Sequence, residues 1–362
     1  MDKFIVNILK KIEKNGFETF VVGGYVRNNL LGINSRDVDI CTNALPKDII
    51  KIFNLKKDTK DNYGSVNIIT KKYNIDITTY RKESNYDLHK PEVEFINNID
   101  DDLERRDFTI NAILLNSNNE LIDKYNGIED LNNKLLKCIG NTKEKLTNDP
   151  LRILRALRFS IIYDLKLDKE IINFIKKNKE LIKKVSYFRR KEELDKIFTS
   201  KNKIKGLELL KDLNLLNELE IDYDNVVYTE DINGIYSQIT FNKNYSFSKE
   251  TKKIISSVKE IIELGNIDNH TLYKFGLYIN SIAGNILGID YSKINKMYNK
   301  LPIKSKKDIK ISYKSIVKLN NNCYNNINDL IRNIEKNILD GKLKNKTSDI
   351  VRFIRKWGYI YE

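Results

Sequence analysis

Two carboxylates stand at alternate positions in one short segment, Asp37 and Asp39 in RDVDI. On an extended chain residues i and i+2 point to the same face, and Mg²⁺ is typically bound by one or two carboxylates together with substrate phosphates. Upstream, Gly23 and Gly24 separate an apolar run from a helical pattern that carries Arg27. A strand–glycine–helix corner lets backbone N–H groups and a helix N-terminus approach a triphosphate. The spacing therefore predicts metal-assisted transfer of a nucleotidyl group, with Asp37 and Asp39 as metal ligands.

Two later segments add charged groups to this set. Asp76 lies in the strand-like segment IDITTY and is a candidate third catalytic acid if that strand lies beside Asp37 and Asp39; a solvated strand aspartate is the alternative. In RRDFTIN, Arg106 could meet a phosphate. Asp107 could accept a hydrogen bond from a ribose hydroxyl and so distinguish ribonucleotides from deoxyribonucleotides. An ordinary charged helix start is the alternative for this second segment.

Three arginines recur at every third residue in NDPLRILRALRF, namely Arg152, Arg155 and Arg158. This spacing forms a gently winding stripe along one side of a helix. A solvated basic face is the usual explanation, but these arginines alternate with leucines, so we expect them to face a cavity or an interface. There they would contact the base or the phosphates of a nucleotide.

Asp149 and Arg152 together could act as a template made of protein. Cytosine and adenine each show an amino donor beside a ring-nitrogen acceptor, which a carboxylate and a guanidinium match. Uracil and guanine present a carbonyl oxygen to the carboxylate instead, and buried mismatches of this kind are strongly rejected. The pair therefore predicts that CTP and ATP are accepted and that UTP and GTP are refused.

Composition narrows the class of protein. A chain of 362 residues is long enough for two or more domains, and no apolar run approaches the ~20 residues that span a membrane. Its two histidines exclude a histidine-rich metal centre, and its three scattered cysteines are typical of the reducing cytoplasm. The net charge of +14 favours a nucleic-acid partner, although AT-rich coding also enriches a chain in lysine.

The elements that must position these residues follow from hydrophobic periodicity. An amphipathic helix is expected at 4–12, a further helix at 25–31, and a third begins at Pro46. Strands are predicted at 19–22, 38–40, 65–70, 75–80 and 113–115. Residues 81–104 are charged and without clear periodicity, which predicts a mobile loop. From about 149 onward the pattern is almost wholly helical.

On these motifs the chain resembles the class II tRNA nucleotidyltransferases, the CCA-adding enzymes of the polymerase-β-like superfamily. The similar segments are 23–27 with 37–42, 105–112, 127–131, 149–158 and the positions Ser186, Arg189 and Glu193. The resemblance implies an α+β fold. A nucleotidyltransferase head at 1–140 would precede an all-α neck at 141–200, which templates the nucleotide, and an all-α body and tail at 201–362, which bind tRNA.

The same resemblance implies an activity and its partners. Two Mg²⁺ ions held by Asp37 and Asp39 would activate the 3′-hydroxyl of a tRNA, and C, C and A would be added from CTP and ATP with release of pyrophosphate. Gly24, Arg27 and Arg106 would hold the triphosphate. The helical part would clamp the acceptor stem and elbow of the tRNA by shape and phosphate contacts, in a monomer or a homodimer. Loop 81–104 would move as specificity switches from C to A.

Some positions depart from the family pattern. Asn28 and Asn148 stand where the family usually has acidic residues, the second of which steadies the templating arginine. In the loop, Tyr86, Asp87 and Pro91 are family-like, whereas His89 and Lys90 replace a more arginine-rich stretch. The alternatives are a partial enzyme that adds only CC or only A, a poly(A) polymerase, or an inactive RNA-binding protein on the same scaffold.

Overall fold

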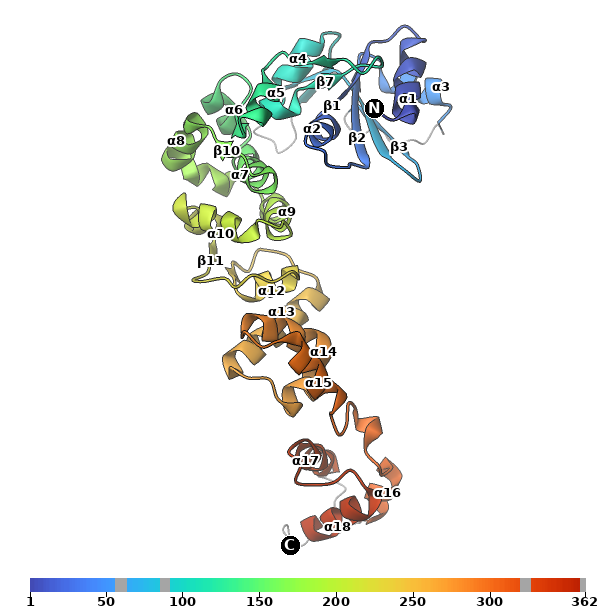
Figure 1. Cartoon of the computed structure of the whole chain (residues 1–362), viewed down its shortest axis with the longest axis vertical. Helices are drawn as coiled ribbons and strands as arrows, with labels where there is room; N and C mark the ends of the chain where they lie inside the picture. Colours follow the sequence, from blue (N-terminus) through green and yellow to red (C-terminus); the bar gives the residue numbers. More distant parts are fainter. Residues whose placement is uncertain (56–63, 85–91, 320–326, 359–362) are drawn as a thin grey trace. The chain divides into compact units, whose positions relative to one another are not determined.

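The computed structural model describes residues 1–55, 64–84, 92–319 and 327–358 (Figure 1). These residues form two compact units, Met1–Glu220 and Ile221–Glu362. The first unit contains the whole of the expected head and neck and the beginning of the expected body, and the division into three parts stays a prediction. The family-like loop positions Tyr86, Asp87, His89, Lys90 and Pro91 lie outside the described residues.

A six-stranded mixed sheet forms the centre of the head. Its strand order is β3-β4-β2-β1-β7-β8, where β2 and β4 are parallel and the other neighbours are antiparallel. The strands are β1 (Thr19–Val22), β2 (Asp37–Thr42), β3 (Ser65–Ile69), β4 (Asn74–Thr79), β7 (Leu114–Leu115) and β8 (Leu121–Ile122). The five predicted strands are confirmed to within a few residues, and β8 was not predicted.

Alternation along β2 decides where the two carboxylates point. Val38 and Ile40 are each 1% exposed, whereas Asp37 and Asp39, which alternate with them, face solvent. A slip of one residue in register would bury both carboxylates, so the apolar residues fix the acidic face. Three helices accompany the sheet, α1 (Lys3–Glu13), α2 (Gly24–Leu30) and α3 (Pro46–Phe53). All three were expected from the sequence.

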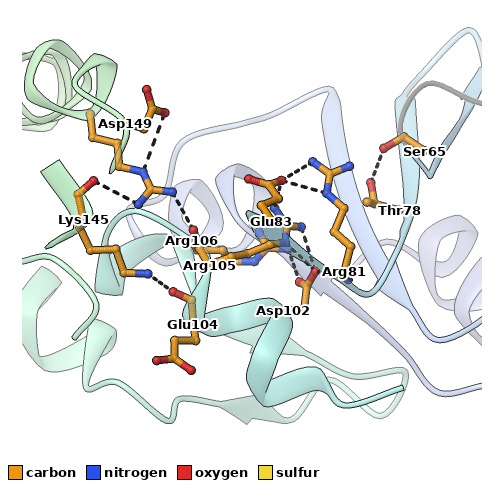
Figure 2. A network of polar contacts seen from close by, with 11 residues as sticks. Ser65, Thr78, Arg81, Glu83, Asp102, Glu104, Arg105, Arg106, Lys145 and Asp149 are labelled. Atoms are coloured by element: carbon orange, nitrogen blue, oxygen red, sulfur yellow. Dashed lines mark hydrogen bonds and ion pairs between the residues drawn. The ribbon is translucent and has the colours of Figure 1, made fainter. Parts of the chain in front are cut away.

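The prediction of a mobile loop over 81–104 is wrong for the residues that the structure describes. Strands β5 (Arg81–Ser84) and β6 (Glu92–Phe95) pair antiparallel, and α4 (Ile99–Glu104) follows. The charged side chains of this segment obscure its hydrophobic periodicity. In the structure they form ion pairs with one another instead of facing water. Glu83 accepts from Arg105 at 3.1 Å, and Asp102, fully buried, accepts from the same guanidinium at 2.9 Å (Figure 2).

The rest of the first unit is mainly helical, with one short parallel pair of strands, β9 and β10, among its described residues. Helix α7 packs against α9 and α10. In order, the remaining elements of this unit are α5 (Gly127–Asn132), β9 (Leu135–Leu136), α6 (Thr142–Asn148), α7 (Leu151–Tyr163), β10 (Lys166–Leu167), α8 (Lys169–Asn178), α9 (Tyr187–Phe198), α10 (Lys203–Asp212) and α11 (Leu216–Leu219). A short 3₁₀ turn, Thr109–Asn111, lies between α4 and β7.

In its described residues the second unit is helical apart from one two-residue pair of strands, β11 (Ile221–Asp222) and β12 (Thr240–Phe241). Its helices are α12 (Ile232–Ser237), α13 (Lys249–Leu264), α14 (Asn269–Ile286), α15 (Tyr291–Asn299), α16 (Tyr313–Leu319), α17 (Ile327–Leu339) and α18 (Thr347–Gly358). One apolar cluster, which includes Leu272, Ile294 and Ile334, joins the helices from α13 to α18. The α+β class and the helical second half are confirmed. Among the described residues, no helix is long and apolar enough to cross a membrane.

Candidate active site

The turn between β1 and α2 brings the main chain against the acidic strand. Gly23 has φ +72°, and a Cβ built on it would lie only 3.1 Å from Oδ2 of Asp39. A side chain here would be strained and would crowd the carboxylate. The backbone N–H of Gly24, the first residue of α2, hydrogen-bonds Asp39. The glycine pair therefore lets a helix N-terminus meet the carboxylate.

Three aspartates lie close together on neighbouring strands. The β2–β4 register pairs Asp39 with Asp76, while Asp37 accepts from Asn74 at 3.0 Å and Asp76 accepts from Asn67 at 2.8 Å. Desolvation raises the pKa of Asp39, and so do Asp76 and Asp37, against the opposing effect of Arg106. Neighbouring carboxylates repel one another when they are ionised, and a bound cation would reduce that repulsion. Within the described ranges, no three His, Cys, Asp or Glu side chains are arranged to hold one ion together.

Arg27 is anchored on the cavity side of α2. Its guanidinium donates to Asn111, to Asn28 at 3.0 Å and to the hydroxyl of Tyr163 at 2.6 Å, and it lies over the Tyr163 ring at 4.4 Å. The amide oxygen of Asn28 also accepts from Tyr163 at 3.0 Å. Asn28 thus supplies a neutral acceptor where the family pattern has a carboxylate. Burial lowers the pKa of Arg27.

Arg106 is fixed by a carboxylate below it. Asp102 is fully buried and accepts from Arg106 at 3.1 Å and from Arg105 at 2.9 Å (Figure 2). Although desolvation opposes ionisation, the two arginines lower the pKa of Asp102. Because Asp102 holds one side of the Arg106 guanidinium, the orientation of its other N–H groups is fixed. Those groups lie near Gly23, where an added Cβ would be 3.7 Å from Nη1 of Arg106.

Asp107 is already engaged by protein groups. It is buried and lies 2.5 Å from the half-buried Arg155 in an ion pair. It also accepts from Asn111 at 2.9 Å and from the amide of Phe108 at 2.9 Å. Burial alone would raise its pKa, but Arg155 and the Asn111 hydrogen bond outweigh burial and lower the pKa to about 2. Asp107 is therefore a fixed negative charge.

The two residues of the predicted template are Arg152 of α7 and Asp149, which lies two residues before that helix. Asp149 lies 4.0 Å from Nε of Arg152 and 3.8 Å from Arg189 of α9. Arg158, on the same helix, forms an ion pair of 2.8 Å with the buried carboxylate of Glu193. Burial lowers the pKa of Arg158, and Glu193 opposes that effect. The stripe of arginines therefore faces partners on other elements, as expected.

One cavity of about 420 Å³ collects these side chains, a size within the usual range for ligand sites. Of the predicted residues, Gly24, Arg27, Asp39, Arg106, Asp107, Asp149, Arg152, Arg155 and Arg158 line it. Asp37 and Asp76 do not line it, although they flank Asp39 on the sheet.

Sequence reasoning assigned no role to several lining residues, including Glu83, Asn111 and Tyr163. The helical repeat offered a signal for Tyr163, since positions 152, 155, 159 and 163 share one face of α7. Asn111 lies within the family-like segment 105–112, and its amide is the group in that segment that marks it as a possible ligand of a charged neighbour. Glu83 carries no signal, because the charged segment around it has no periodicity that predicts a strand.

Family models match three stretches of the chain. The Poly A polymerase head domain matches residues 19–137, the probable RNA- and SrmB-binding site of polymerase A matches 164–223, and the tRNA nucleotidyltransferase domain 2 matches 237–354. The first stretch contains the acidic strand and the glycine turn. The first match ends at residue 137, close to the predicted end of the head at 140, whereas the second runs from 164 to 223 and does not coincide with the predicted neck at 141–200.

Curated relatives match over nearly the whole chain. The CCA-adding enzyme of Ligilactobacillus salivarius is 32% identical over 96% of this chain and 95% of its own, and that of Streptococcus uberis is 30% identical with the same coverage. Among solved structures, the CCA-adding enzyme of Bacillus stearothermophilus in complex with CTP has a TM-score of 0.82 at 21% identity, covering 99% of this chain and 97% of that one. The Thermotoga maritima enzyme complexed with tRNA has a TM-score of 0.74 at 20% identity, covering 99% and 96%. The fold and the whole-chain identity agree, and the chain belongs to the family of CCA-adding enzymes, which are tRNA nucleotidyltransferases.

Proposed function

We propose that this member of the family adds C, C and A from CTP and ATP to the 3′ end of tRNA in the cavity beside Asp39. The observation that carries the proposal is the meeting of an acidic strand with an arginine-lined cavity. Asp39 lies at the edge of both, in register with Asp76 and against the Gly23–Gly24 turn. An attacking hydroxyl near Asp39 would face a triphosphate held by the arginines. The P–O bond to the β-phosphate would then break, and pyrophosphate would leave.

Asp37 and Asp39 are the residues that would hold two Mg²⁺ ions. Both carboxylates lie on one exposed face of β2. Desolvation is the main cause of the raised pKa of Asp39, and the neighbouring carboxylates Asp76 and Asp37 add to it; a bound cation would oppose both effects. Bound Mg²⁺ would favour deprotonation of the attacking 3′-hydroxyl and neutralise charge on the departing pyrophosphate. Asp76 would act from β4 by adding negative charge next to Asp39.

The triphosphate would lie against Gly24, Arg27 and Arg106. Gly24 is the first residue of α2 and lines the cavity, and helix N-termini favour anions. Arg27 is held by Tyr163 and two asparagine side chains, so its charge has a fixed position and costs little reorganisation on binding.

Two carboxylates would read the rest of the nucleotide. Asp107, oriented by Arg155 at 2.5 Å, would accept a hydrogen bond from the ribose. Asp149 and Arg152 would read the amino group and ring nitrogen shared by cytosine and adenine. Arg155 and Arg158 would add positive charge beside the base and phosphates.

The helical remainder would bind the acceptor stem and elbow of the tRNA. The excess of 64 basic over 50 acidic residues supports phosphate contacts, and double-helical RNA is recognised mostly by shape. We place the protein in the cytoplasm as a monomer or a homodimer. Cys41 and Cys138 are free thiols, which fits a reducing compartment.

Extension of a tRNA that ends at its discriminator base tests the proposal. The reaction would contain Mg²⁺ and CTP, ATP, UTP or GTP singly, then CTP with ATP, with products resolved to one nucleotide. We expect two additions with CTP alone and a third only when ATP joins. Arrest after CC with both nucleotides, extension only of a CC-ended tRNA, or a long A tract would assign the protein to a CC-adding enzyme, an A-adding enzyme or a poly(A) polymerase.

A further inference from the structure

The guanidinium of Arg152 is held by the main chain of two different segments. Nη2 donates to the carbonyl oxygen of Arg105 at 2.8 Å, and Nη1 donates to the carbonyl oxygen of Lys145 at 3.4 Å. Arg105 follows α4 in the head, whereas Lys145 lies on α6, just before the helix that carries Arg152. The direction of the guanidinium therefore depends on the spacing between these two segments.

Lys145 also connects the two segments directly. Its ammonium donates to the carbonyl oxygen of Glu104, the residue before Arg105 (Figure 2). One residue thus supplies an acceptor for Arg152 and holds the segment that supplies the other acceptor. Lys145 is half-buried, and desolvation, together with the nearby charge of Arg152, lowers its pKa.

The contact of Lys145 differs from that of a phosphate-binding lysine. Within the described residues, Lys145 is not part of the cavity lining, whereas Arg105 and Arg152 are. Its amine is committed to a backbone carbonyl, so it acts on the cavity only through the position of other groups. Asn148 at the end of the same helix is exposed and carries no charge with which to orient Arg152.

We propose that Lys145 is a positioning residue for base selection, which sets the direction of Arg152 by joining α6 to the segment after α4. The inference rests on the proposed role of Arg152 as the reader of the base. Loss of the Lys145 contact would free the carbonyl of Arg105 to move, and Arg152 would then lose a defined direction. A loosely held guanidinium still attracts a nucleotide but discriminates poorly between ring edges, since specificity depends on directed donors.

The test compares Lys145→Met with Lys143→Met, a matched control at an exposed position two residues earlier on α6. The kcat/KM values for CTP and UTP are measured on a tRNA that ends at its discriminator base, and those for ATP and GTP on a tRNA that ends in CC. We expect K145M to lower the CTP:UTP and ATP:GTP ratios of kcat/KM by about tenfold, because a change of this size corresponds to the loss of one charge-assisted hydrogen bond. The kcat/KM for CTP itself should change less than threefold, and Lys145→Arg should restore most of the discrimination.

Three results would overturn the inference: unchanged ratios in K145M, equal changes in K143M, or an equal loss of incorporation for all four nucleotides. Circular dichroism establishes that each variant is folded. If methionine prevents folding, Lys145→Gln, with a shorter neutral side chain, should lower the same ratios by a smaller factor, and unchanged ratios in K145Q would count against the inference. A wild-type protein that itself fails to prefer C and A over U and G would refute the base-reading role of Arg152, and that outcome is separate from any effect of Lys145.

Discussion

Asp107 offers a direct test of the electrostatics of the cavity through the change Asp107→Asn. The side chain is 6% exposed, and its pKa is lowered from 3.8 to about 2, because Arg155 and the Asn111 hydrogen bond outweigh burial. A group whose pKa is lowered in the folded state stabilises that state above its unfolded pKa, and this contribution is lost as pH falls through the folded pKa. The shift corresponds to about 2 kcal/mol of unfolding free energy at pH 7. At pH 3 roughly half of that remains.

The assay is urea denaturation of the wild type and the variant at pH 7, 5 and 3. Unfolding would be followed by the native amide NMR signal of Ile110, which is fully buried in the first unit, so that the second unit does not enter the reading. We expect the difference in unfolding free energy to be about 2 kcal/mol at pH 7 and to shrink toward pH 3. Other titrating groups affect both proteins alike and cancel in the difference.

Asp212→Asn is the control, since Asp212 is exposed at the end of α10. It should change the unfolding free energy by less than about 0.5 kcal/mol at every pH. A loss in the Asp107 variant that is equal at pH 7 and pH 3, or no larger than the loss in the control, would refute the reasoning. The ion pair with Arg155 would then not be the cause of the stability.

Three further outcomes are expected. Asp39→Ala should abolish nucleotide transfer, because Asp39 lines the cavity and would hold the metal. The affinity for tRNA in a filter-binding assay should stay within about twofold of wild type, and a tenfold loss of that affinity would contradict this separation. Tyr163→Phe removes the hydroxyl that accepts from Arg27 at 2.6 Å. It should raise the KM for both CTP and ATP about tenfold, since hydrogen bonds to charged groups contribute roughly 1.5–3 kcal/mol. An unchanged KM would show that Arg27 does not depend on this hydrogen bond for its position. Glu193→Ala leaves Arg158 without its partner at 2.8 Å and should lower the unfolding free energy by about 3 kcal/mol in urea denaturation. Adding Arg158→Met to this variant should recover part of the lost stability. A further loss in the double variant would show that the broken ion pair is not the cause.

Much of the head could be predicted because its signals are local. The alternation of Asp37 and Asp39 with Val38 and Ile40 requires a strand with one acidic and one buried face. Gly23 and Gly24 mark the turn that must approach that face. The repeat of arginines at every third residue likewise placed Arg152, Arg155 and Arg158 on one helix, and all three line the cavity.

The sequence by itself determined which residue types lie on which face of each strand and helix, because the periods of 2 and 3.6 residues are properties of the chain alone. Only the tertiary structure decided their partners. The hydroxyl of Tyr163 meets Arg27 across 136 residues of sequence, and Arg152 meets the carbonyl oxygen of Arg105 across 47. The segment at Glu83 has no periodicity, yet it forms a strand in which Glu83 is neutralised by the neighbouring Arg81 and by Arg105, which lies 22 residues further along the chain. Such contacts depend on sheet register and helix packing, which have no local repeat in the sequence.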